Sequence, residues 1–146
     1  MDQFRDEFDK KCLENGIFLE EENVSVTGRV QTMRMQGAKL MFIDIEGDQQ
    51  KLQLMANAAS YKGDFEELVA SVKRGDIIGV EGQPGRSKTG ELSLRPSTII
   101  SLSYCMHMLP KTEGDKNVLT KDTRYRQRYL DLIMNNPVKK IFRTRN

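Results

Sequence analysis

Apolar and polar residues alternate along two neighbouring stretches in the first half of the chain, which predicts two β-strands. In residues 39–45 the alternation separates an aliphatic face from a second face that carries Phe42. In residues 51–55 the leucines point one way and Gln53 points the other. The polar run Glu-Gly-Asp-Gln at 46–49 supplies the glycine that a hairpin turn uses. The aliphatic face, which we expect to be buried, consists of Met41, Ile43, Ile45, Leu52 and Leu54.

Apolar residues at helical spacing predict two helices in the same part of the chain. The first, at residues 2–14, has one narrow apolar stripe among mixed charges, so docking on the next domain is favoured over contact with RNA. The second, at residues 64–72, follows a capping aspartate, Asp64, and ends before Gly75. The stripe of the first helix is Phe4, Phe8 and Cys12, with Leu13 alongside.

The order of these elements predicts the fold. Strands are expected at residues 24–30, 39–45, 51–55, 76–82 and 91–104, with a basic turn at 84–90. Five strands with a helix between the third and fourth have the order and size of the OB-fold, a Greek-key barrel. We therefore predict a mainly β chain in three parts. These are an N-terminal helix at 1–16, the OB-fold barrel at 23–108, and a linker leading into helices at 109–146.

Composition changes after Pro110, where a polar linker precedes a helix expected at 123–133. A second helix is expected to begin at Asn136-Pro137, with Asn136 as its cap and the proline in its first turn. Because its apolar stripe stops at Asn146 with nothing left to pack on, we expect the protein to continue beyond this residue.

Composition also limits the class of protein. The chain has 146 residues, a net charge of +2 and 38% apolar residues, which is ordinary for a soluble protein. No apolar run approaches the roughly 20 residues of a membrane span, and the first residues do not resemble a signal peptide. Cys12 and Cys105 lack metal-ligand spacing, and His107 is the one histidine. We expect reduced thiols, no metal, no cofactor in this chain, no membrane contact and a cytoplasmic location.

Phe42 and Gln53 are the first candidates for binding, because the predicted hairpin presents both on its second face. An aromatic ring beside an amide suits an unpaired base, which stacks on the ring while the amide reads its edge. The alternative is that Phe42 belongs to the core, which is the commoner place for a phenylalanine.

Several longer runs resemble the class II lysyl-tRNA synthetases. They are GRV at 28–30, KLQLMAN at 51–57, RGDIIGV at 74–80, TGELS at 89–93 and TRYRQRYLDLI at 123–133. The last run is typical of the lysine enzyme, whereas the related aspartate and asparagine enzymes share the barrel without it. The resemblance extends from about Val24 to the C-terminus, and residues 1–23 resemble the family only loosely.

The resemblance implies a binding site for the anticodon loop of tRNA(Lys), whose central uridine this family reads with its N-terminal barrel. It implies that Phe42 stacks on that base, that Gln53 and Glu91 hydrogen-bond its edge, and that Arg34 contacts the same nucleotide. Strand alternation supports an outward direction for Phe42, Gln53 and Glu91. Arg34 shares alternation with the inward valines of its strand, so it faces outward only beyond a bulge or the strand end.

Other basic residues are expected to act without regard to base sequence. Arg86 and Lys88, on the predicted basic turn, should attract the RNA backbone. Arg124, Arg126 and Arg128 are expected either to contact tRNA or to form salt bridges with a further domain.

For the whole protein, the resemblance implies a lysine–tRNA ligase that activates lysine with ATP and Mg²⁺ and forms a homodimer through its catalytic domain. This chain should recognise tRNA without catalysing, because the ATP site is expected to follow Asn146. The alternative is a stand-alone OB-fold adaptor that binds single-stranded nucleic acid or protein, with Tyr125 and Tyr129 on a docking helix.

Overall fold

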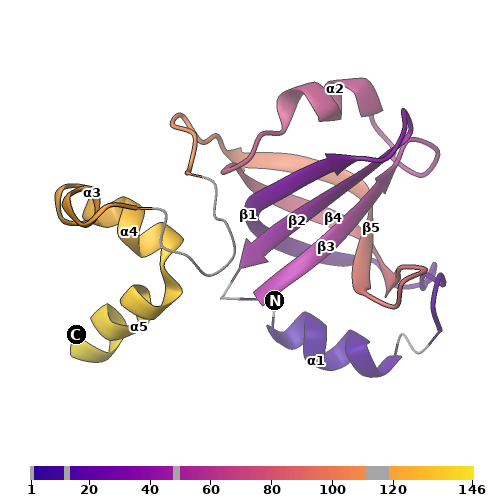
Figure 1. Cartoon of the computed structure of the whole chain (residues 1–146). Helices are drawn as coiled ribbons and strands as arrows, with labels where there is room; N and C mark the ends of the chain where they lie inside the picture. Colours follow the sequence, from indigo (N-terminus) through magenta and orange to yellow (C-terminus); the bar gives the residue numbers. More distant parts are fainter. Residues whose placement is uncertain (1, 12–13, 48–49, 111–118) are drawn as a thin grey trace. The chain divides into compact units, whose positions relative to one another are not determined.

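The computed structural model of the chain describes residues 2–11, 14–47, 50–110 and 119–146. The chain divides into two compact units, Met1–Met106 and His107–Asn146. Among the described residues, the first unit contains a closed β-barrel and two helices, and the second contains three short helices (Figure 1). None of the helices in the described part of the chain is long and apolar enough to pass through a membrane.

Five strands close the barrel in the order β1-β2-β3-β5-β4. Neighbouring strands are antiparallel except β3 and β5, which pair in parallel over a short stretch. The strands are β1 (Val24–Met35), β2 (Leu40–Gly47), β3 (Gln50–Asn57), β4 (Ile77–Arg86) and β5 (Leu92–Ser103). With a helix between β3 and β4, this arrangement confirms the predicted OB-fold.

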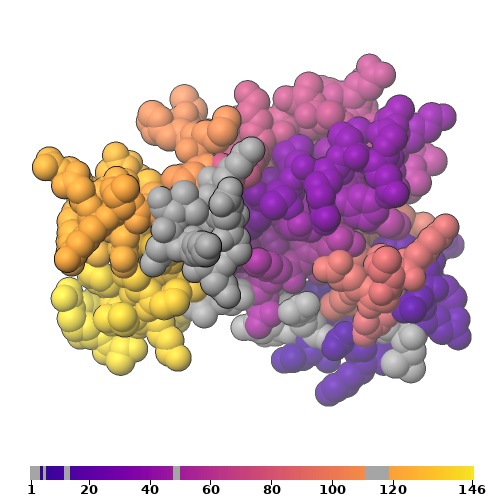
Figure 2. Space-filling model, in the orientation of Figure 1, coloured from indigo at the N-terminus to yellow at the C-terminus, as the bar shows by residue number. Residues whose placement is uncertain are grey.

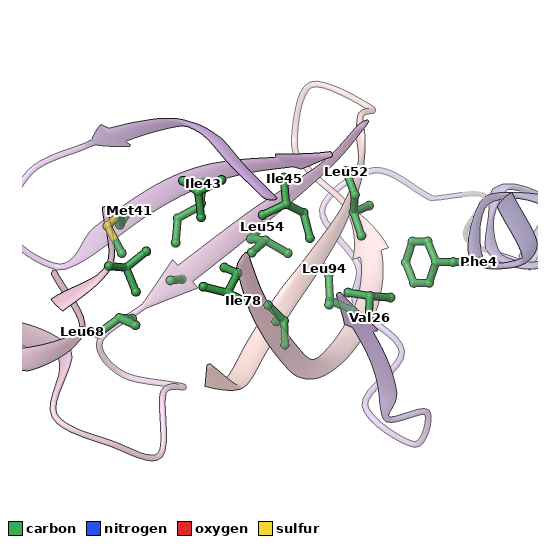
Figure 3. Packing of buried hydrophobic residues seen from close by; sticks show 14 of the residues in the cluster. Phe4, Val26, Met41, Ile43, Ile45, Leu52, Leu54, Leu68, Ile78 and Leu94 are labelled. Carbon is green, nitrogen blue, oxygen red and sulfur yellow. The ribbon is translucent and has the colours of Figure 1, made fainter. Parts of the chain in front are cut away.

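The aliphatic face predicted for the central hairpin fills the barrel, and all five of its residues are buried. Two helices cover the ends of this core: α1 (Asp2–Lys11) and α2 (Phe65–Ser71). Figure 3 shows Leu68 of α2 beside Met41 at one end, and Phe4 of α1 at the other end. The N-terminal helix therefore docks on the barrel, as its mixed charge predicts. Cys12 and Leu13, assigned to its stripe, lie outside the described residues.

Two strands are longer than the alternation of side chains indicates. β1 continues to Met35, because a bulge shifts the alternation after Val30. β4 continues through Pro84 to Arg86, since these residues pair with the start of β5, so the basic turn begins only at Ser87. The prediction of a turn over 84–90 was therefore wrong for its first half. In the β2–β3 hairpin, residues 48–49 of the predicted turn lie outside the described residues.

The second unit contains α3 (Lys121–Arg126), α4 (Arg128–Met134) and α5 (Asn136–Arg145). The single helix predicted over 123–133 is wrong, because the backbone leaves the helical region at Gln127 (φ −116°, ψ 66°). The cap of α5 is Asn135 rather than Asn136, and it makes no side-chain capping bond. Its amide instead donates to the carboxylate of Asp131.

That carboxylate explains the break between α3 and α4. Asp131 is fully buried, and it accepts hydrogen bonds from Arg124 Nε at 2.9 Å and Arg128 Nη1 at 3.0 Å. Because the chain turns at Gln127, both arginines reach one acceptor. These ion pairs lie within the second unit. They therefore test neither of the two predictions made for these arginines, contact with tRNA or salt bridges with a further domain.

Burial alone would raise the pKa of Asp131, but hydrogen bonds from Asn135 and Arg124, together with the charges of Arg124 and Arg128, outweigh it. The pKa of Asp131 therefore lies below its ordinary value of 3.8. A carboxyl whose pKa is lower in the folded than in the unfolded chain stabilises the fold when ionised. Its contribution is present above the ordinary pKa and is lost as the pH falls through the lower folded value.

We expect α3–α5 to lose helix content in acid for this reason. Asp131→Asn should lower their helix content at neutral pH and remove much of the acid dependence, measured by NMR of residues 119–146. Asp122→Asn is the matched control, because Asp122 and its partner Arg126 are both exposed and such pairs contribute little. The same acid midpoint in wild type and Asp131→Asn would contradict this assignment.

Candidate nucleic-acid interface

Three of the predicted site residues share the outer face of β1, β2 and β3. Arg34 of β1 lies directly opposite Phe42 of β2. Phe42 lies opposite Met55 of β3, two residues from Gln53 along the strand. Opposite and diagonal neighbours on one face of a sheet lie within reach of long side chains. The strand register therefore brings Arg34, Phe42 and Gln53 together.

Arg34 faces outward because of the bulge in β1. Val26 and Val30 are buried, and unbroken alternation from them would bury Arg34 as well. The register shifts between Val30 and Thr32, which leaves Gln31 as the extra residue. As a result, 62% of the Arg34 side chain is exposed. The bulge required by the sequence argument is confirmed.

Asp44 holds Arg34 on this face and was not assigned a role from the sequence. Its carboxylate lies 3.4 Å from Arg34 Nη2 and also accepts a hydrogen bond from the hydroxyl of Thr32. Asp44 shares the outward alternation of Phe42, so the pattern of residues 39–45 already placed it near the site. Arg34 keeps further guanidinium donors for a ligand, because one arginine offers five N–H groups.

Phe42 is half-buried and lies outside the hydrophobic core cluster of the barrel. The alternative that Phe42 is a core residue is therefore not what the structure shows. Its side chain is therefore neither fully buried nor fully exposed. A ring held in this way offers a stacking surface for a base.

Gln53 and Glu91 are joined by a hydrogen bond from Gln53 Nε2 to Glu91 Oε2, at 3.1 Å. Glu91 is exposed at the end of the turn between β4 and β5, where Ser87 N donates to its carbonyl. This turn, salmon in Figure 2, stands next to the violet surface of the first strands. The pair presents a carboxylate acceptor and an amide donor side by side, and Gln53 lies diagonal to Phe42 in the strand register.

The two cations of the predicted basic turn have different surroundings. Arg86 ends β4, and its guanidinium binds the carbonyl of Gly90 at 2.7 Å and the carboxylate of Asp9 in α1. Only 21% of its side chain is exposed. Lys88, in contrast, is exposed on the turn. The structure therefore places Arg86 as a link between α1 and the barrel, and it leaves Lys88 accessible to a phosphate.

Nothing in the described part of the chain resembles a metal centre, since no group of three or more His, Cys, Asp and Glu side chains converges there. The glycine-containing run from Gly82 to Lys88 belongs to β4 and the turn after it. It leads into a strand, whereas a phosphate-binding P-loop leads into a helix.

Comparison with known proteins agrees with this fold and this face. A family model for tRNA anti-codon binding, described as an OB-fold nucleic acid binding domain, matches residues 24–102. The chain belongs to this OB-fold family. All of the residues on the outer face described above, from Arg34 to Glu91, lie within the matched range of the OB-fold domain.

Several similar curated proteins are lysine–tRNA ligases. Lysine–tRNA ligase cla4 of Cladosporium cladosporioides is 41% identical over 127 residues, which cover 84% of this chain and 21% of that protein. The lysine–tRNA ligase of Magnetococcus marinus is 38% identical over 130 residues, which cover 88% of this chain and 25% of that protein. The lysine–tRNA ligase of Helicobacter pylori is 36% identical over 152 residues, which cover 94% of this chain and 30% of that protein. The OB-fold domain and its flanking helices thus span between about a fifth and a third of these relatives, and the resemblance to lysyl-tRNA synthetases is confirmed.

Proposed function

We propose that this OB-fold domain reads the central uridine of the tRNA(Lys) anticodon loop with the outer face of β1–β3. The observation that carries the proposal is the hydrogen-bonded Gln53–Glu91 pair on the face of the sheet that carries Phe42. The edge of uracil offers one N–H donor between two carbonyl acceptors. The carboxylate of Glu91 can accept from that N–H, and the amide of Gln53 can donate to a carbonyl. Cytosine has an acceptor nitrogen where uracil has its N–H, and an amino group where uracil has the adjacent carbonyl. It would therefore place an acceptor against the carboxylate of Glu91 and a donor against the amide donor of Gln53.

The cations of this face would hold the nucleotide backbone. Arg34 stands across from Phe42, where the phosphate of a stacked nucleotide can reach its guanidinium. Lys88 lies on the exposed turn that carries Glu91 and would meet the backbone without regard to base. Neither contact distinguishes uridine from cytidine, so base specificity rests on Gln53 and Glu91.

The experiment is binding of an anticodon stem-loop with the sequence UUU, compared with the same loop carrying cytidine at the central position. We expect the wild-type chain to prefer UUU. Gln53→Ala should weaken the UUU complex by about 1–3 kcal/mol. It should also reduce the preference for UUU over the loop with a central cytidine, because a contact to the base edge specifies the base. Lys88→Ala is the control: it should weaken both loops alike and flatten the salt dependence. Equal binding of both loops by the wild type would rule out uridine reading.

The whole protein would then be a lysine–tRNA ligase, which joins lysine to tRNA(Lys) with ATP and Mg²⁺, as a cytoplasmic homodimer. The names of the relatives, each of which is a lysine–tRNA ligase, support the ligase activity. The same names favour tRNA reading over a stand-alone adaptor, although Tyr125 and Tyr129 are exposed as an adaptor would need.

The described residues of this chain do not fit ATP and Mg²⁺, because they contain neither a converging acidic cluster nor a phosphate-binding loop. We therefore expect the purified chain to bind the stem-loop without activating lysine. Lysine-dependent exchange of pyrophosphate into ATP, measured with the chain alone, should remain at the level of the protein-free reaction. Exchange above that level would contradict this expectation.

A further inference from the structure

We propose that Ser93 is a positioning residue that orients the amide of Gln53 and thereby sets the preference for uridine over cytidine. The proposal rests on the function proposed above. Ser93 lies on β5 directly beside Gln53 of β3, where these two strands form the parallel pairing of the barrel. The alternation of side chains along β5 does not assign this serine a role, because its partner is 40 residues away.

The hydroxyl of Ser93 is a donor in this structure. Its oxygen lies 3.1 Å from Gln53 Oε1 and 3.0 Å from the backbone carbonyl oxygen of Glu91. Both neighbours are acceptors and the hydroxyl has one proton, so this proton is shared between the two oxygens or donated to one of them at a time. Gln53 is thus held at both ends of its amide: Oε1 faces Ser93, and Nε2 faces the carboxylate of Glu91 at 3.1 Å.

The orientation of this amide decides which base edge it matches. An amide carries a donor at one end and an acceptor at the other, and the two ends exchange places when the group turns over. With Nε2 beside Glu91, the amide presents a donor to a base, which suits a uracil carbonyl. The reversed amide would present an acceptor and would suit the amino group of cytosine. Fixing the amide therefore favours one pyrimidine over the other.

Ser93 rather than Glu91 is the partner that survives binding. Glu91 is exposed, and its carboxylate is the group that the uracil N–H would engage. The contact between Gln53 and Glu91 is therefore open to competition from the ligand. Ser93 is fully buried, so no ligand reaches its hydroxyl. The end of the amide next to Ser93 keeps its hydrogen bond whether or not a base is present.

The variant that tests this is Ser93→Ala, with two measurements. The first, without RNA, is the pair of side-chain amide signals of Gln53 in NMR, identified by their loss in Gln53→Ala. Both signals in wild type should be shifted from those of a free glutamine side chain and exchange slowly with solvent, and Ser93→Ala should move both shifts toward the free values and speed exchange. The second is binding of the UUU loop and the loop with a central cytidine. The preference for uridine should fall by about tenfold, as expected when a buried amide oxygen loses its donor.

Ser101→Ala is the matched control, because Ser101 is a second serine of β5 whose buried hydroxyl has no hydrogen-bond partner among the described residues. It should leave both measurements unchanged. In a Gln53→Ala background, Ser93→Ala should have no further effect on the preference. If Ser93→Ala does not fold, Ser93→Cys keeps a weak donor in nearly the same place and should give an intermediate preference.

Three results would overturn the proposal. Unchanged amide signals of Gln53 in Ser93→Ala would show that Ser93 does not hold the amide. Altered signals with an unchanged preference would show that the orientation does not set specificity. Equal binding of both loops by wild type would overturn the function on which the proposal rests, and the amide signals would still report whether Ser93 anchors Gln53.

Discussion

Phe42→Ala is expected to lower the affinity for the UUU stem-loop by about tenfold or more and to leave the barrel folded. Stacking of a base on an aromatic side chain contributes roughly 1–3 kcal/mol, and alanine removes the stacking surface. Because Phe42 is half-buried and lies outside the core cluster, its truncation should cost less stability than the roughly 3–5 kcal/mol of a core phenylalanine. Titration of the stem-loop and thermal unfolding measure the two quantities separately.

Phe65→Ala is the control for Phe42→Ala, since Phe65 is a buried core residue of α2. It should lower the melting temperature, and at temperatures where it stays folded it should bind the UUU loop like wild type. Two results would refute the assignment of Phe42 as the stacking residue. One is unfolding of the barrel by Phe42→Ala, and the other is an equal loss of affinity for matched and mismatched loops.

Gly82→Ala is expected to destabilise the barrel by at least about 3 kcal/mol, more than ordinary overpacking of a core. Gly82 pairs with Pro96 at the irregularity between β4 and β5. A Cβ atom there would lie 2.2 Å from the carbonyl oxygen of Arg95 and 2.8 Å from the Cα atom of Pro96. Both are backbone atoms, so the clash is relieved only by separating the two strands.

The matched control is Gly79→Ala in the same strand. The three atoms nearest to its Cβ would all belong to the side chain of Leu102, the first at 3.4 Å, which is close to ordinary contact and can be relieved by a small rotation. Urea unfolding of both variants measures the difference. A Gly82→Ala variant as stable as Gly79→Ala would show that β4 and β5 separate at little cost. In that event the close pairing of these strands is not required for barrel stability.

The sequence by itself determined the order of the barrel elements and the filling of the barrel. The period-two pattern of residues 39–55 assigned Met41, Ile43 and Ile45 to the core and Phe42 and Gln53 to the opposite face. This works because side chains in a strand alternate strictly, so local order along the chain decides which face is buried. The runs resembling lysyl-tRNA synthetases likewise identified the family, and the candidate base-reading residues followed from them.

Only the tertiary structure decided which partner each polar side chain binds. The sequence treated Arg86 and Lys88 alike, yet Arg86 binds Asp9 in α1 while Lys88 is exposed. Similarly, the continuous helix suggested by the apolar spacing of residues 123–133 is broken at Gln127, next to a buried carboxylate that two arginines share. Arg86 and Asp9 lie on elements far apart in the sequence, and the apolar spacing of residues 123–133 carries no information about which carboxylate becomes buried.

The direction of Arg34 and the anchoring of Gln53 were likewise decided by the tertiary structure. The sequence indicated that Arg34 needs a bulge to face outward, and only the pairing of β1 with β2 placed that bulge at Gln31. Ser93 meets Gln53 because the barrel closes with β5 beside β3. Local alternation determines which face a residue is on. Barrel closure determines which residue stands beside it, because contacts between strands depend on register between segments distant in sequence.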